Sequence, residues 1–208
     1  TTQGQAAPQT AGGIDTQDPQ NVSTAIQLLL LMTVLSLAPA VLVMVTSFTR
    51  IIVVLSLVRN AIGIPQLPPN QVMIGLALFL TAFVMAPAIK QINTEAVQPY
   101  LNGTITQQEA YDRGEGPLRA FMLKQTRQQD LGLFLKLSNS EKPETIDDVP
   151  TYVLVPAFTI SELKTAFQMG FVMFVPFLII DLIVSSALLS MGMMMLPPVI
   201  VSLPFKIL

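Results

Sequence analysis

The sequence contains no cysteine, no histidine and no tryptophan, and it is poor in charge. Without cysteine and histidine the chain has no disulfide, no thiol nucleophile, no common zinc site and no histidine proton shuttle. Only 12% of its 208 residues are charged, against about 25% in an ordinary soluble domain. The net charge of −2 offers no basic surface to nucleic acid. We therefore expect no metal, no cofactor, no catalytic residues and no nucleic-acid partner.

Apolar residues are abundant instead. They make up 51% of the chain, whose mean hydropathy is +0.60, and a soluble globule of this size could not bury that much apolar surface. Fifteen of the 24 charged residues lie between Glu95 and Asp148. This distribution is typical of a membrane protein with one polar insert.

The apolar pattern divides the chain into four segments and predicts an all-α, membrane-associated fold. Residues 1–20 are rich in Gln, Thr and Gly and predict a flexible tail, whose start looks like the product of signal-peptide removal. Residues 21–90 predict a first apolar helical hairpin. Residues 91–158 predict a polar, amphipathic helical insert, and residues 159–208 predict a second apolar hairpin with a Met-rich tip.

Local signals predict where helices begin and end. A capping box at residues 106–109 should open a helix in the insert, and a second one at 159–162 should open the last long helix. The run Gly-Glu-Gly-Pro at 114–117 predicts an interruption. Residues 149–156, which contain Pro150 and Pro156, predict an extended segment.

The charge bias predicts an orientation. Residues 47–70 carry Arg50 and Arg59 and no acid, whereas residues 91–160 carry six basic and nine acidic residues. The positive-inside rule puts the first segment in the cytoplasm and the insert outside.

Asp181 is the sharpest local signal, because no other charge occurs from residue 165 to 205. A lone carboxylate in such a run costs several kcal/mol, so it should be neutral, hydrated or paired. If the chain reverses near residue 194, Lys206 would lie within about 3 Å of the same level. We expect an ion pair, within one chain or between copies. The alternative is a proton or ion relay, which would make the protein a proton-coupled transporter or an ion channel.

Methionine is concentrated at the tip of the second hairpin, where four of the 11 methionines fall in residues 191–195, followed by Pro197 and Pro198. Methionine side chains are flexible and adapt to changing neighbours. Non-helical backbone at membrane depth is tolerated only when it is buried or lines a cavity. The tip is therefore either a buried turn or part of a ring that forms a deformable seal.

Several unusual motifs occur in one order: residues 46–56, the proline turn at 65–69, residues 116–122, Asp181, and the Met-rich run 191–198. In these motifs the chain, from about residue 21 to 208, resembles the FliP family of flagellar export-gate proteins. The resemblance implies a non-enzymatic subunit of the flagellar type III export gate. Close relatives in virulence type III secretion are the alternative branch.

The resemblance also implies partners and a location. Family members form a helical channel. In this channel FliP is a homo-oligomer, which we expect to be pentameric, and it assembles with FliQ and FliR. FlhA and FlhB are expected as further partners. The channel lies in the bacterial inner membrane at the flagellar basal body, with much of the chain on the periplasmic side. Unfolded rod, hook and filament proteins pass through it, driven mainly by the proton motive force.

By position, Met193, Met194 and Met195 fall on the family's pore constriction, which seals the channel when no substrate passes. Asp181 and Lys206 fall on charged positions that hold neighbouring helices together.

Subunit contacts are implied less sharply. Phe121, Phe134 and Glu162 lie in regions that look like contacts between subunits. Arg50 and Arg59 are expected to act as interface anchors or as further subunit contacts.

Overall fold

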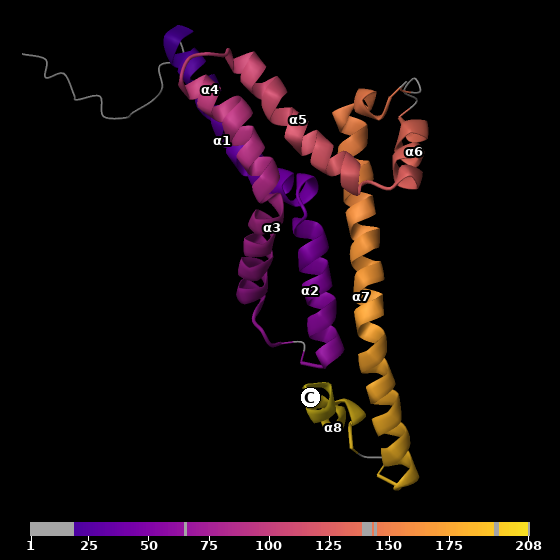
Figure 1. Ribbon diagram of the computed structural model, residues 1–208. Coiled ribbons are helices and arrows are strands. Elements are labelled where there is room, and N and C mark those ends of the chain that lie inside the picture. The colour runs from indigo at the N-terminus through magenta and orange to yellow at the C-terminus, as the bar shows by residue number, and fades with distance from the viewer. Residues whose placement is uncertain (1–18, 65, 139–142, 144, 194–195, 208) are drawn as a thin grey trace, which may run out of the picture. The chain divides into compact units, whose positions relative to one another are not determined.

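The computed structural model describes residues 19–64, 66–138, 143, 145–193 and 196–207, and over these residues the chain is helical and contains no strand (Figure 1). The all-α prediction is therefore confirmed for this part of the chain. In order, the elements are α1 (Pro19–Val45), α2 (Phe48–Ile62), α3 (Asn70–Ile92), η1 (Asn93–Val97), α4 (Gln98–Leu101), α5 (Gln107–Gln125), α6 (Gln128–Leu137), η2 (Ile146–Asp148), α7 (Thr151–Ser190) and α8 (Pro198–Ile207).

The chain divides into two units, residues 1–40 and residues 41–208. The described part of the first unit is the N-terminal part of α1. Its hydroxyl groups bond to the backbone of their own helix: Thr33 Oγ1 donates to the Leu29 carbonyl at 2.7 Å, and Ser36 Oγ donates to the Thr33 carbonyl at 2.8 Å. Satisfying these groups internally suits a helix in an apolar environment.

Among the residues that the structure describes, three helical stretches are long and apolar enough to cross a membrane: Ala25–Val45, Asn70–Leu101 and Thr151–Ser190, with 21, 32 and 40 residues. The second stretch is the continuous run of α3, η1 and α4. At 1.5 Å per residue α7 extends over about 60 Å, roughly twice the 30 Å thickness of a hydrocarbon core. A single bilayer crossing therefore accounts for only half of α7.

Helix α7 is the element on which the second unit is built. Helices α2 and α7 run side by side (Figure 1), and Gly170 of α7 lies directly against Leu57 of α2. A Cβ atom placed on Gly170 would come within 2.2 Å of Leu57 Cδ1 and 3.1 Å of Leu57 Cβ. Glycine is thus required here for the close approach of the two helices.

The hydrophobic core of the second unit lies where the polar insert meets the first turns of α7. Its buried members are Met122, Val149, Val153, Leu154 and Phe158. The rings of Phe121 and Phe158 pack edge to face with their centroids 5.9 Å apart, a favoured aromatic geometry. Helix α6 packs on this core with one face, which carries Leu131, Phe134 and Leu135.

The extended segment predicted for residues 149–156 is wrong, because α7 already begins at Thr151 and passes through Pro156. A proline inside a helix costs about 3 kcal/mol through its missing N–H and its clash with the preceding turn. Here the helical conformation places Val153, Leu154 and Phe158 in the core, where each is at most 2% exposed. Burying three large apolar side chains outweighs that cost.

The interruption predicted at residues 114–117 is also wrong, since α5 is continuous and contains Pro117. Gly114 lies against η1 without a gap: a Cβ there would be 3.6 Å from Ala96 Cβ. The capping box at 106–109 is confirmed, with the Thr106 amide donating to Glu109 Oε2 at 2.8 Å and the Glu109 amide donating to Thr106 Oγ1 at 3.3 Å.

Replacing Gly170 with alanine should destabilise the packing of α2 on α7. Overpacking costs about 1–3 kcal/mol, which exceeds the gain of about 1 kcal/mol in helix propensity. We expect a lower midpoint of thermal unfolding in detergent, and partial recovery in the Gly170→Ala, Leu57→Ala double variant. Gly75→Ala is the matched control, because nothing lies within 4 Å of its added Cβ. An unfolding midpoint for Gly170→Ala equal to that of the control would contradict the close contact.

Candidate functional site

Helix α7 carries three charged residues in 40, and each of them is paired with a different helix. Glu162 pairs with Arg50 of α2, Lys164 pairs with Asp130 of α6, and Asp181 pairs with Lys206 of α8. Charges in an apolar helix are costly unless paired. These three contacts define the polar sites of the second unit.

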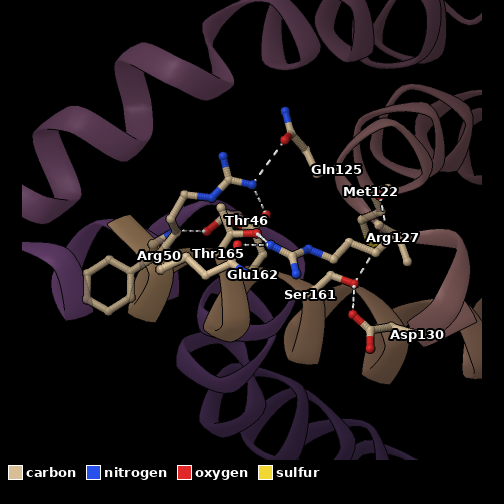
Figure 2. A network of polar contacts seen from close by, with 12 residues as sticks. Thr46, Arg50, Met122, Gln125, Arg127, Asp130, Ser161, Glu162 and Thr165 are labelled. Carbon is tan, nitrogen blue, oxygen red and sulfur yellow. Dashed lines mark hydrogen bonds and ion pairs between the residues drawn. The ribbon is translucent and has the colours of Figure 1, made fainter. Parts of the chain in front are cut away.

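The first site joins α2, α5 and α7 (Figure 2). Arg50 Nη2 donates to Glu162 Oε1, and it also donates to Gln125 Oε1 at 3.0 Å. The Glu162 side chain is buried, and its second oxygen, Oε2, makes no hydrogen bond with the described residues. The Ser47 hydroxyl and Arg50 Nε are likewise buried without a bond to those residues. Removing either charged partner would leave the other charge buried and uncompensated.

The second site fastens α6 to α7 and uses polar side chains from the predicted capping box at 159–162. That prediction is wrong, because those residues lie inside α7. Ser161 Oγ accepts a hydrogen bond from the Arg127 amide at 3.0 Å and donates to Asp130 Oδ2 at 2.9 Å (Figure 2). Lys164 Nζ donates to Asp130 Oδ1. Asp130 is 1% exposed.

Electrostatics keep Asp130 ionised. Burial on its own would raise the pKa of Asp130, but the hydrogen bonds from Lys164 and Ser161, together with the charges of Lys164 and Arg127, outweigh it. They hold the pKa below its ordinary value of 3.8.

The third site closes the hairpin of α7 and α8. Lys206 Nζ lies 2.7 Å from Asp181 Oδ2 and donates to the Ala61 carbonyl at 3.0 Å, while Ser202 Oγ donates to Asp181 Oδ1 at 2.5 Å. The Lys206 side chain is 2% exposed and that of Asp181 is 31% exposed. Because Ala61 belongs to the last turn of α2, Lys206 bonds to one of the carbonyls that a helix end leaves without an internal partner. A single ammonium group thus joins α2, α7 and α8.

The turn at the tip of this hairpin has a defined geometry. Gly192 has a φ of 74°, its amide donates to the Leu189 carbonyl at 3.1 Å, and the Met193 amide donates to the Leu188 carbonyl at 3.0 Å. This pair of bonds around a left-handed glycine is a Schellman motif, which ends a helix abruptly. Met191 is 71% exposed and Met193 is 41% exposed. The motif therefore projects methionine side chains from the tip.

The described residues include Met193 but neither Met194 nor Met195, so two of the three predicted constriction residues lie outside them.

The other predicted contact residues are engaged within the chain. Phe121 and Phe134 pack on the core, and Glu162 is buried against Arg50. Arg59 Nη1 donates to Asn70 Oδ1 at 2.7 Å and to the Pro68 carbonyl at 3.3 Å. Arg59 thus holds the connection between α2 and α3. That these five residues contact other subunits stays a prediction.

Sequence reasoning missed several residues of these sites. Ser202 could have been found, because it lies four residues before Lys206 on one helix and so shares a face with it. Asp130, Gln125 and Ser161 could not, since their partners lie more than 30 positions away along the chain. Arg119 was also missed: it donates to the carbonyls of Asp147 and Val149 at 2.9 and 2.6 Å.

No three acidic residues come close enough to hold a metal ion within the part of the chain that the structure describes.

Asp130→Asn should loosen α6 from α7. The charge-assisted bonds to Asp130 are worth about 1.5–3 kcal/mol at neutral pH, and the variant loses them. Because the pKa of Asp130 is depressed in the folded protein, its contribution is fully present above the ordinary pKa of 3.8 and is lost as the pH falls below it. The protection of the α6 amides against hydrogen exchange, corrected for the intrinsic pH dependence of exchange, should therefore fall below about pH 4 in the wild type, and this fall should be smaller in the variant. Asp112→Asn, at an exposed carboxylate of α5, is the control. If the protection of α6 depended on acid pH in the same way in the wild type and in Asp130→Asn, the role of Asp130 in fastening α6 to α7 would be refuted.

Comparison with known proteins identifies the chain's relatives. The model of the FliP family matches residues 31–208. Three curated relatives carry the name "Flagellar biosynthetic protein FliP". That of Bacillus subtilis (strain 168) is 58% identical over 191 residues, covering 92% of this chain and 86% of the relative. That of Pectobacterium carotovorum subsp. carotovorum is 53% identical over 188 residues, covering 90% and 73%. That of Aquifex aeolicus (strain VF5) is 51% identical over 189 residues, covering 90% and 79%. The chain therefore belongs to the FliP family.

Proposed function

We propose that this chain is a subunit of the flagellar type III protein export gate. Several copies surround a passage through which unfolded rod, hook and filament proteins leave the cell. The observation that carries the proposal is the match to relatives named for flagellar biosynthesis over about nine-tenths of the chain. Their name also favours the flagellar branch over the virulence branch.

The chain's surface supports assembly with other proteins. Helices α3 and α7 expose many large apolar side chains, among them Phe79, Phe83, Phe171 and Val172. Only the first half of α7 packs on α2, α5 and α6, so the apolar side chains of its second half need a cover from outside the chain. We infer that copies of the chain, together with FliQ and FliR, cover the rest, in a pentameric assembly that contacts FlhA and FlhB.

The Met-rich turn is proposed as the seal of the passage. A ring of these Met-rich tips, one from each copy, would close a narrow pore with flexible thioether side chains, which can part for a chain of varied sequence and close behind it. The Schellman motif at Gly192 fixes where the helix ends, and the Asp181–Lys206 pair fixes the two arms of the hairpin. The side chains of the proposed seal are therefore flexible, whereas the backbone that carries them is held in place.

The location follows from the same proposal. The assembly sits in the bacterial inner membrane at the flagellar basal body. The charged insert lies on the periplasmic side, and the connection between α2 and α3, to which Arg59 of α2 bonds, faces the cytoplasm, in keeping with the positive-inside rule. We propose a channel scaffold rather than an enzyme.

Truncating Met193, Met194 and Met195 to alanine should open a leak. Shorter side chains leave a wider, wettable constriction, so the assembled complex in planar bilayers should conduct small ions more than the wild type. Met173→Ala, which truncates another exposed methionine of α7, is the control and should leave conductance unchanged. Equal conductance of the wild type, the triple variant and Met173→Ala would show that the Met-rich turn does not form the seal.

The wild-type chain should restore swimming to a Bacillus subtilis strain that lacks its own FliP, and Asp181→Asn or Lys206→Met should not. Breaking a buried pair costs about 3–5 kcal/mol, so both variants should lose the detergent-extracted complex on a sizing column. Exchanging the two charges should recover assembly only in part, because an aspartate at 206 cannot donate to the Ala61 carbonyl. Lys90→Met, at an exposed cation of α3, is the control.

The same experiment separates the proposed function from a proton-coupled transporter that uses Asp181 as its coupling carboxylate. In a transporter, Asp181→Asn would keep the complex intact and abolish coupling alone. A wild-type chain that assembles but does not restore motility would count against the export-gate role.

A further inference from the structure

The second unit has an apolar groove that its own residues leave open. It lies between the end of α1 and the run of α3, η1 and α4 on one side and α5 and α7 on the other, with a volume of about 600 Å³. Its lining includes Ala96, Val97, Tyr100, Tyr111, Leu118 and Val155. Contiguous apolar surface is unfavourable in water, so a groove of this kind is expected to be covered in the working protein.

Helix α6 carries a matching ridge. Its inner face packs on the core, but Leu133 and Leu137 on the outer face are 51% and 68% exposed. Residues four apart on a helix form a continuous ridge, and such ridges pack into the grooves of other helices. Neither leucine belongs to the core or to the apolar side chains packed against it.

Ridge and groove of one chain do not meet each other. Helix α6 lies on one side of α7, and helices α3 and α4 lie on the other (Figure 1). A ridge on one side and a groove on the other can join two copies head to tail, and repetition of that contact closes a ring when the rotation allows it.

The charges beside the two surfaces are complementary. Lys136 is exposed next to Leu137 and forms no ion pair with the described residues. Glu115 lines the groove, where it accepts a hydrogen bond from Thr151 and lies 3.7 Å from Arg119. Asp112, one turn earlier on α5, is exposed. Opposite charges placed beside an apolar contact fix its register and orientation.

We propose that the ridge of Leu133 and Leu137 in one copy of this chain docks in the groove between α4 and α5 of the next copy, with Lys136 facing Asp112 and Glu115. This interface rests on the proposed function, in which copies surround a passage. A second copy fits better than lipid, because the ridge and the walls of the groove from η1, α4 and α5 lie in the segment from Glu95 to Asp148 that holds fifteen of the 24 charges. Acyl chains would have to pass this charged rim.

Cysteine cross-linking tests the contact without background, since the chain contains no cysteine. Leu137→Cys and Tyr111→Cys, made together in the full-length chain, should give a ladder of multimers on a non-reducing gel after membranes are treated with copper–phenanthroline and dissolved oxygen. Each single variant should stay monomeric, and the two single variants expressed together should give dimers only. Leu67→Cys with Leu137→Cys is the control, because Leu67 lies in the connection between α2 and α3 and should give no ladder.

Sizing of the same extracts separates this interface from the proposed function. If the double-cysteine variant runs as a monomer on the gel although its complex has the wild-type mass on the sizing column, the proposed interface is wrong and the export-gate role stands. Monomers on the gel from a chain that never assembles would overturn both.

A charge exchange tests the contact without cysteine. Lys136→Glu should lower the yield of assembled complex several-fold, and adding Asp112→Lys should restore it. Lys124→Glu, at an exposed cation elsewhere on the insert, should leave the yield unchanged. A Lys136→Glu complex of wild-type yield, or one that Asp112→Lys does not rescue, would overturn the pairing.

Discussion

Pairing of the charges on α7 is the constraint on which the arrangement of residues 41–208 depends. A buried ion pair adds little net stability, but a packing that leaves one charge unpaired is disfavoured by several kcal/mol. Glu162, Lys164 and Asp181 therefore select their neighbours: α2 at the first, α6 at the second, and α8 with the end of α2 at the third. Apolar packing supplies most of the stabilisation, but apolar surfaces are non-directional. The charged contacts decide which faces meet.

Two glycines, Gly170 and Gly192, also determine how the helices of this unit are arranged. Gly170 lets α2 approach α7 closely enough for the Arg50 side chain to reach Glu162, and Gly192 ends α7 where the hairpin must turn. Both glycines serve geometry that a side chain would prevent. The proposed seal thus combines a turn fixed by backbone bonds with side chains that remain adaptable.

Sequence reasoning predicted the helical class, the apolar stretches and the register of Asp181 with Lys206, because rise per residue and apolar length are local properties. It failed where tertiary packing overrode a local signal. Pro156 and Pro117 lie inside helices because burial of their neighbours outweighs the lost backbone bond. Thr159 and Glu162 have the spacing of a capping box, yet Glu162 bonds across helices to Arg50, as its neighbour Ser161 does to Asp130. No pattern within a few residues distinguishes these two uses of a polar side chain.

The length of α7 has a consequence for biogenesis. In a newly made subunit the first half of α7 packs largely on α2, α5 and α6, but its second half exposes large apolar side chains such as Phe171, Leu182 and Ile183, which have no protein cover until neighbours arrive. The solitary chain is thus the species most open to aggregation and to quality-control proteases, and its survival depends on how fast it meets its neighbours. The helix that would shape the finished passage also makes prompt co-assembly a condition of the subunit's persistence.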